Sequence, residues 1–235
     1  MMRITKTFPS LFFTAILFFL VTSCDKLISD GRVNEGEIEF DVTYPKMISD
    51  NFMIDVLPDK MLLIFQEERY VTEIAAGMGM FRTNFMSDAD NMELTQLVKL
   101  LNKKHKLTLN NEGVKEMLEK SPKYTVEFTN ETKEIAGYKC KKANITTSDD
   151  EKFSVFYTED INIKMPNWAT PYHEINGVLL EYQMEKYDLC MRFTATNVTT
   201  VEVEDEVFEN FQDYEEISEQ EMDEKLSEIF ESFNQ

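Results

Sequence analysis

The sequence contains few residues whose type and spacing could carry out catalysis. Its two histidines, His105 and His173, lie outside any metal-ligand spacing such as His-Glu-x-x-His. The glycine-rich phosphate loops and the Gly-x-Ser-x-Gly nucleophile motif are absent from the sequence. With so many carboxylates, some pair will meet by chance, so a pair alone does not indicate hydrolysis. We therefore expect no metal site, no cofactor and no enzymatic activity.

Cys24 is the cysteine with the most specific surroundings. It follows Leu-Val-Thr-Ser, after a basic start with Arg3 and Lys6 and an apolar run over residues 8–21. A short apolar run of this kind is typical of a secretory signal peptide. Its ending resembles the bacterial lipobox, which implies cleavage before Cys24 and acylation of that residue. Because several acyl chains hold a protein stably on a membrane, we expect a lipid-anchored protein.

The other two cysteines lie in segments that read as strands. Cys140 and Cys190 would be in an oxidising compartment, where a disulfide between them could form. Free cysteines are also often simply buried as small apolar residues. The sequence leaves both alternatives open, because the register of the strands cannot be read from it.

The net charge restricts the class of partner. The formal charge is −20, and removal of residues 1–23 with their two cations would make it −22 (−20 minus 2). Such a chain has no basic surface to neutralise phosphates, so we expect no nucleic-acid partner. The remaining length suits one β-rich domain with a sizeable core. We expect a signal peptide at 1–23, a lipidated tether at 24–36, a domain at 37–214 and an acidic helix at 215–235.

Most of the chain reads as short strands with alternating apolar residues, joined by polar turns. Residues 92–109 are ambiguous: Leu94, Leu97, Val98 and Leu101 have helical spacing, but residues 102–104 read as a turn. The expected strands are Glu37–Tyr44, Lys60–Gln66, Arg69–Ala75, Phe81–Ser87, Tyr124–Thr132, Gly137–Thr146, Lys152–Thr158, Gly177–Lys186 and Leu189–Val198.

Two helices are expected. Residues 112–120 have a plausible cap at Asn111 and a stop at Ser121-Pro122. Residues near 218–233 begin with a capping box at Ser218 and Glu221. The apolar residues that follow share one face, so we expect this amphipathic helix to pack on the domain rather than to bind a partner. They are Met222, Leu226, Ile229, Phe230 and Phe233.

Several stretches resemble an uncharacterised family of Gram-negative lipoproteins. They are residues 131–143, 77–80, 156–158, 166–168 and 174–182. That family is similar to the lipoprotein-carrier (LolA/LolB-like) fold, in which an antiparallel sheet curls into an incomplete β-barrel. The resemblance implies this mainly β (α+β) fold, two strands rather than a helix at 92–109, and a place in the cell envelope. We expect the outer membrane, with the periplasmic or surface face left open.

From this fold we expect an apolar ligand, an acyl chain or lipopeptide, under the curved sheet. The alternative is a structural or interaction lipoprotein that binds an envelope protein and fills its own core. Fourteen methionines suit an adaptable lining, and a tryptophan in a loop often closes a pocket. The candidate ligand residues are Phe52, Met53, Met78, Met80, Trp168, Tyr172, Leu180 and Tyr182.

Overall fold

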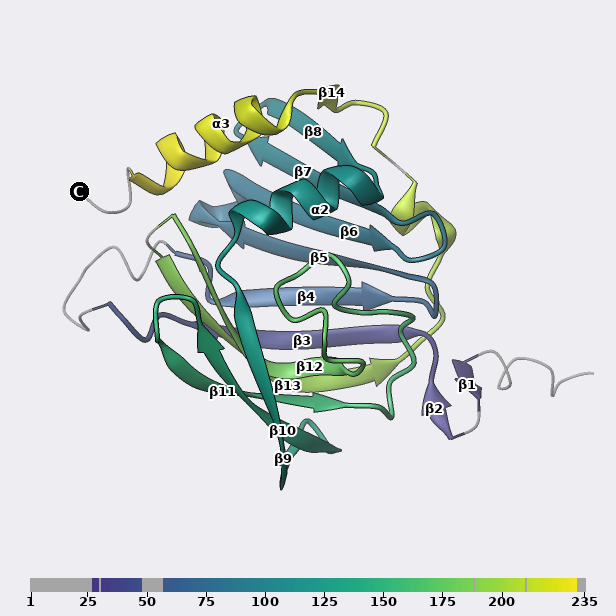
Figure 1. Ribbon diagram of the computed structural model, residues 1–235. Helices are drawn as coiled ribbons and strands as arrows, with labels where there is room; N and C mark the ends of the chain where they lie inside the picture. Colours follow the sequence, from purple (N-terminus) through teal and green to yellow (C-terminus); the bar gives the residue numbers. More distant parts are fainter. Residues whose placement is uncertain (1–26, 30, 48–56, 188, 210, 232–235) are drawn as a thin grey trace, which may run out of the picture.

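The computed structural model is organised around one strongly curled sheet (Figure 1). It describes residues 27–29, 31–47, 57–187, 189–209 and 211–231. The sheet has twelve strands in the order β14-β8-β7-β6-β5-β4-β3-β13-β12-β11-β10-β9. Neighbouring strands are antiparallel except for β14, which pairs with β8 in parallel. The expected mainly β fold with an incompletely closed sheet is therefore confirmed.

Buried and more exposed side chains alternate along strands in the first half of the sheet. In β3, for example, Ile38, Phe40 and Val42 are buried while the residues between them are more exposed, as a strand with one face on a core requires. The strands of this half are β3 (Gly36–Thr43), β4 (Lys60–Phe65), β5 (Arg69–Ala76), β6 (Phe81–Asp88), β7 (Glu93–Leu100) and β8 (Lys103–Leu109). The ambiguous segment 92–109 therefore forms two strands.

The expected meander forms the second half. Its strands are β9 (Tyr124–Ile135), β10 (Tyr138–Thr147), β11 (Lys152–Thr158), β12 (Val178–Lys186) and β13 (Leu189–Thr200). The last of them, β13, pairs with β3 and so joins the two halves. A separate hairpin near the N-terminus contains β1 (Ile28–Ser29) and β2 (Arg32–Val33). Among the described residues, no helix is long and apolar enough to cross a membrane.

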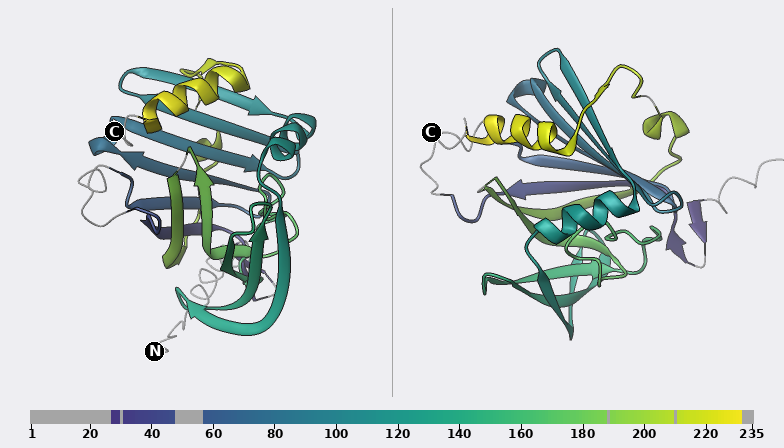
Figure 2. Two further views of the ribbon diagram at one scale, coloured as in Figure 1. Left: turned by 60° about the vertical axis from the view of Figure 1, so that its left-hand side comes forward. Right: turned by 45° about the horizontal axis from the view of Figure 1, so that its top comes forward.

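Both helices lie on the concave face of the sheet (Figure 2). Helix α2 (Asn111–Lys120) is capped by Asn110, whose side chain accepts a hydrogen bond from Gly113 N at 3.0 Å. Its Val114 packs with Leu94 on β7. Helix α3 (Glu219–Glu231) packs Met222 and Leu226 against the concave side of β5–β8. The described residues of α3 thus pack on the domain, as expected from the sequence.

The capping box of α3 gives a prediction about pH. Hydrogen bonds from the backbone and side chain of Ser218 hold the pKa of Glu221 below its usual value. The folded state therefore gains stability above the unfolded pKa of about 4.3, and this gain is lost as pH falls through the lower folded pKa. Glu221→Gln keeps a capping acceptor but removes the charge. We expect it to be less stable than the unchanged chain near neutral pH, with the difference shrinking in acid.

Thermal or urea unfolding between neutral and acidic pH measures this difference. Glu224→Gln, an exposed change one turn from the cap, is the matched control. A stability gap for Glu221→Gln that stays constant into acid would contradict the prediction.

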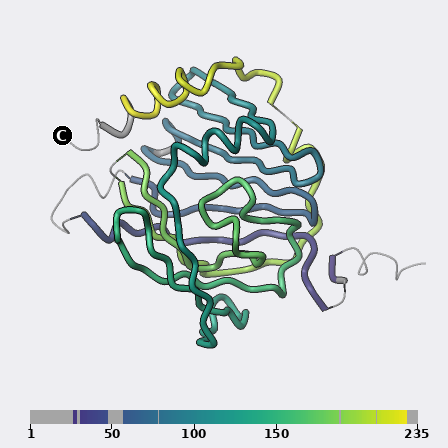
Figure 3. Tube along the Cα trace, viewed as in Figure 1, coloured from purple at the N-terminus to yellow at the C-terminus, as the bar shows by residue number. Residues whose placement is uncertain are grey.

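The segment between β13 and α3 wraps around one end of the sheet. We call residues 201–218 the C-terminal strap. Its Val203 and Phe208, the latter in the 3-10 turn η3 (Asp205–Phe208), pack on Val71 on the convex face, opposite α3. Figure 3 shows this part of the chain climbing along one side of the sheet toward β8. There β14 (Glu215–Glu216) pairs with the edge strand β8, and the chain crosses to the concave face.

The loop 159–177 lies on the concave face, between α2 and the central strands (Figure 1). Two hydrogen bonds attach it to the sheet: Trp168 donates from Nε1 to Ser87 Oγ at 2.8 Å, and Tyr70 donates to the carbonyl of Pro166. Asn167 binds the loop's own backbone. The loop thus fills the hollow of the sheet with side chains. Residues 48–56, which include the candidate ligand residues Phe52 and Met53, lie outside the described residues.

Candidate functional site

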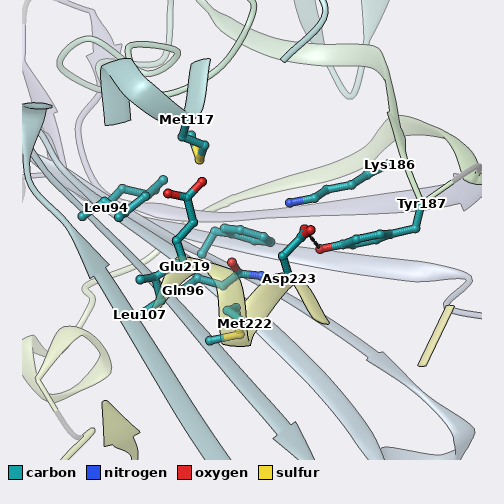
Figure 4. A pocket seen from close by; sticks show the side chains of 11 residues that line it. Leu94, Gln96, Leu107, Met117, Lys186, Tyr187, Glu219, Met222 and Asp223 are labelled. Atoms are coloured by element: carbon teal, nitrogen blue, oxygen red, sulfur yellow. Dashed lines mark hydrogen bonds between the residues drawn. The ribbon is translucent and has the colours of Figure 1, made fainter. Parts of the chain in front are cut away.

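A cleft of about 60 Å³ opens on the concave face between α2 and α3 (Figure 4). The strands β6–β8 form its floor, and the end of the β12–β13 hairpin forms one wall. A buried water requires about 10–15 Å³ of such space, so the cleft has room for a few waters or hydroxyl groups. Its lining residues are Phe85, Leu94, Gln96, Leu107, Leu109, Met117, Lys186, Tyr187, Glu219, Met222 and Asp223.

Local periodicity explains how these side chains reach the cleft. On β7, alternation places Leu94, Gln96 and Val98 on the concave face. On α3, Glu219 and Asp223 are one turn apart and therefore lie on the same side of the helix. The capping box at the start of α3 fixes where that turn begins. The helix thus presents two carboxylates above an apolar floor.

The polar groups of the cleft are partly bonded to each other. The hydroxyl of Tyr187 donates to Asp223 Oδ1 at 2.8 Å, and burial together with this carboxylate raises the pKa of Tyr187. Lys120 donates to Glu219 Oε1 at 2.9 Å. Loss of water around Lys186 lowers the pKa of its amine, although Asp223 and Glu219 oppose this shift. Each carboxylate keeps an oxygen that can accept from a ligand.

Gln96 is the unusual residue of the floor. Its side chain is 8% exposed, and its amide makes no hydrogen bond with any residue that the structure describes. Its amide atoms are not among the buried unpaired atoms of the described residues, so the amide is open to the cleft that Gln96 lines. A ligand or ordered waters in the cleft would supply the missing bonds. Gln96 therefore marks the cleft as a site for a hydrogen-bonding guest.

The chemistry of the cleft is that of binding and orientation. It combines an apolar floor with a few convergent donors and acceptors, which is the usual composition of a ligand site. Carboxylates, an amide and an amine suit a neutral ligand rich in hydroxyl groups. Within the described part of the chain, no cluster of His, Cys, Asp and Glu could hold a metal ion. The expectation of no metal site remains a prediction for the whole chain.

The residues predicted from sequence for an apolar ligand lie elsewhere. Tyr172, Leu180 and Tyr182 belong to the packed interior, where the ring of Tyr182 stacks on Phe193 at 4.8 Å. Trp168 packs near α2 and is bonded to Ser87. None of these four lines the cleft. These residues therefore pack in or beside the protein interior. The expected apolar ligand under the sheet stays a prediction.

The remaining predicted residues have varied positions. Met80 is exposed beside the 3-10 turn η2 (Gly77–Gly79). The side chain of Met78, and Cys24, Phe52 and Met53 as whole residues, lie outside what the structure describes. Cys140 and Cys190 are buried free thiols on β10 and β13, with two strands between them, so no disulfide joins them. Burial raises the pKa of the Cys140 thiol to about 11, which makes it a poor nucleophile.

Sequence reasoning missed Gln96, Tyr187, Glu219 and Asp223. A signal for Gln96 was present, since it is a polar residue in the alternating apolar series Leu94, Val98 and Leu100. The others gave no local signal, because carboxylates on a solvated helix and a tyrosine at a turn are ordinary. Only the packing of α3 brings them to Gln96.

One family model matches most of this chain. A family model described as "N-glycanase peptide, N-terminal domain" matches residues 46–222. Among solved structures, "Structure of PNGF-II in C2 space group" matches 83% of this chain with a TM-score of 0.52 and 19% identity. The match covers 33% of that chain, so this chain spans about a third of its length. No curated protein matches. At this identity the structural match supports the fold alone.

Two expectations from the sequence are wrong. The resemblance to a LolA-type lipoprotein family is contradicted, because the family model that matches is the N-glycanase one. The resemblance rested on five short stretches, whereas the family model matches one range over residues 46–222. The expectation of no enzymatic role is contradicted as well, because the family model that matches is described as an N-glycanase domain.

Proposed function

The chain belongs to the family of N-glycanase N-terminal domains, and from that premise we propose that it acts in the enzymatic processing of N-glycans. In this proposal the cleft between α2 and α3 receives part of the glycan. The domain binds and orients the substrate there. The N-glycanase activity, its substrates and its partners are parts of the proposal, because this chain spans about a third of the matching solved protein.

The observation that carries the proposal is the unpartnered amide of Gln96 beneath Glu219 and Asp223. Sugar hydroxyls both donate and accept, so they can bond to an amide and to carboxylates at once. The apolar floor of Phe85 and Leu94 suits the carbon-bound hydrogens of a sugar ring. Figure 4 shows the Glu219 side chain pointing toward Met117 and the Asp223 side chain beside Tyr187, where both would meet the hydroxyl groups.

A binding experiment with the full chain tests this function. We expect an N-glycopeptide to bind and its deglycosylated counterpart to bind far more weakly, as measured by titration calorimetry. Gln96→Leu should weaken glycopeptide binding about tenfold, since one or two hydrogen bonds of a buried site are lost. It should not destabilise the fold, because the amide has no partner among the described residues.

Glu224→Gln, an exposed change on the same helix, is the matched control and should bind like the unchanged chain. Equal binding of the glycosylated and deglycosylated peptides would overturn the proposed function. So would glycopeptide binding that is unaffected by Gln96→Leu.

The lipid anchor is a separate proposal. It rests on the lipobox-like sequence before Cys24, and so does the proposed place in the cell envelope. Cys24 lies outside the described residues. Anchoring and glycan binding are compatible, since the tether and the cleft belong to different parts of the chain.

A further inference from the structure

A second groove lies on the opposite, convex face of the same strands. It has a volume of about 250 Å³, with β6–β8 as its floor and the C-terminal strap as its wall. In Figure 2 the strap and α3 are on opposite sides of these strands. The groove is therefore separated from the α2–α3 cleft by the thickness of the sheet. Its lining residues are Met86, Glu93, Thr95, Lys106, Thr108, Glu209, Phe211 and Gln212.

Thr95 presents a hydroxyl group to the floor of this groove. The residue is 3% exposed, lies on the convex face of β7 and lines the groove. Its hydroxyl makes no hydrogen bond to any side chain or backbone group in the described residues. Its oxygen is not among the buried unpaired side-chain atoms of the described residues, so it remains accessible from the groove. Thr95 thus presents a free acceptor and donor to whatever occupies the groove.

The charges of the groove leave a net excess of carboxylate. Lys106, the single cation in the lining, forms an ion pair with Glu216 at 2.9 Å and is thereby neutralised by the strap. Glu93 and Glu209 lie on the floor side and the wall side, and neither has an ion-pair partner within the described parts of the chain. The chain as a whole carries −20, so the surrounding field also favours a cation.

The apolar residues of the groove suit a long cationic side chain, whose methylenes and charged group they can contact. Phe211 lines the wall and meets Tyr214 edge to face, with ring centroids 6.3 Å apart. An aromatic face attracts an ammonium or guanidinium group within about 6 Å. Met86 offers a thioether for the methylenes. The volume falls below the roughly 300–1,000 Å³ of ordinary small-molecule pockets, which suits one side chain better than a whole ligand.

We propose that this convex groove receives a lysine or arginine side chain from a basic polypeptide segment. The carboxylates of Glu93 and Glu209 and the hydroxyl of Thr95 accept from its N–H groups, and Phe211 covers its stem. This inference does not depend on the proposed glycan function, because it uses other residues on another face.

Fluorescence anisotropy with a labelled oligolysine peptide and the full chain tests the proposal. We expect binding that weakens as salt is added, because exposed charges are screened. Glu93→Gln combined with Glu209→Gln should weaken it about tenfold or more. Thr95→Val should weaken it severalfold at unchanged charge. The same peptide with acetylated lysines should not bind.

The matched control is Glu204→Gln combined with Glu206→Gln, two exposed acids of the strap outside the groove. It makes the same change in net charge and should bind nearly as the unchanged chain does. An equal loss in this control would show general attraction to an acidic surface and overturn the proposal. Binding of the acetylated peptide, wild-type binding by Thr95→Val, or no binding of oligolysine by the unchanged chain would overturn it too.

Discussion

Leu226→Ala is expected to lower the free energy of unfolding by about 2–5 kcal/mol, the range for truncating a buried leucine. Leu226 is 3% exposed and packs with Met222 against Phe81, Val98 and Leu107 on the concave face. Removing its side-chain methyl groups leaves a void that helix and sheet cannot both close. Urea unfolding followed by circular dichroism measures the loss. Because α3 also carries Glu219 and Asp223, glycopeptide binding should weaken in the same variant.

Glu228→Ala is the matched control, since Glu228 is exposed on the same helix and its replacement by alanine removes no buried group. It should change stability by no more than about 0.5 kcal/mol. An unfolding midpoint for Leu226→Ala equal to that of the unchanged chain would contradict the packing of α3 on the sheet.

The strands were predictable from the sequence because most of them bury one face only. Alternation identified β3 to β6 and the meander, and the turn residues between them set their lengths. Segment 92–109 was ambiguous for a physical reason. Leu97 lies on the convex face with 1% exposure, while Leu94 and Val98 lie on the concave face. A strand buried on both faces loses its alternation and can mimic helical spacing.

The strap that buries this convex face could not be predicted. Its few apolar residues, such as Val203 and Phe208, are separated by acids, so the segment has neither a helical nor a strand period. Its course depends on contacts with strands more than a hundred residues away. Both grooves depend on it, because it forms the wall of one and delivers α3 to the other. This is why neither site could be recognised from a local motif.

The loop 159–177 differs from the strap, because the sequence pointed to it as a covering segment but did not show how it is held. Trp168 and its place in a loop suggested a segment that closes an opening, and the hydrogen bond from Trp168 to Ser87 attaches this loop to the sheet. Trp168 also suggested a ligand pocket beneath the loop. The loop instead holds itself together through Asn167, a residue without any special sequence context. Its two hydrogen bonds to backbone carbonyls became visible only in the structure.

Asn167→Ala is accordingly expected to lower the free energy of unfolding by about 2–4 kcal/mol, because each buried polar group left unpaired costs about 1–3 kcal/mol. Asn167 is 6% exposed, and its Nδ2 donates to Ile175 O at 2.7 Å and to Gly177 O at 2.9 Å. Its loss would release the turn that positions Trp168 beside Ser87. Tryptophan fluorescence should therefore shift to the red, since Trp168 is the single tryptophan in the chain.

Asn176→Ala is the matched control, an exposed asparagine in the same loop, and should leave both stability and emission nearly unchanged. The variant Asn167→Asp separates geometry from donor chemistry, since it keeps the shape but replaces two N–H donors with an acceptor facing two carbonyls. It should destabilise at least as much as Asn167→Ala at neutral pH. If Asn167→Ala and Asn176→Ala unfold at the same urea concentration with the same emission, the loop is held by apolar contacts alone, and the bonds of Asn167 contribute nothing to the closure of the sheet.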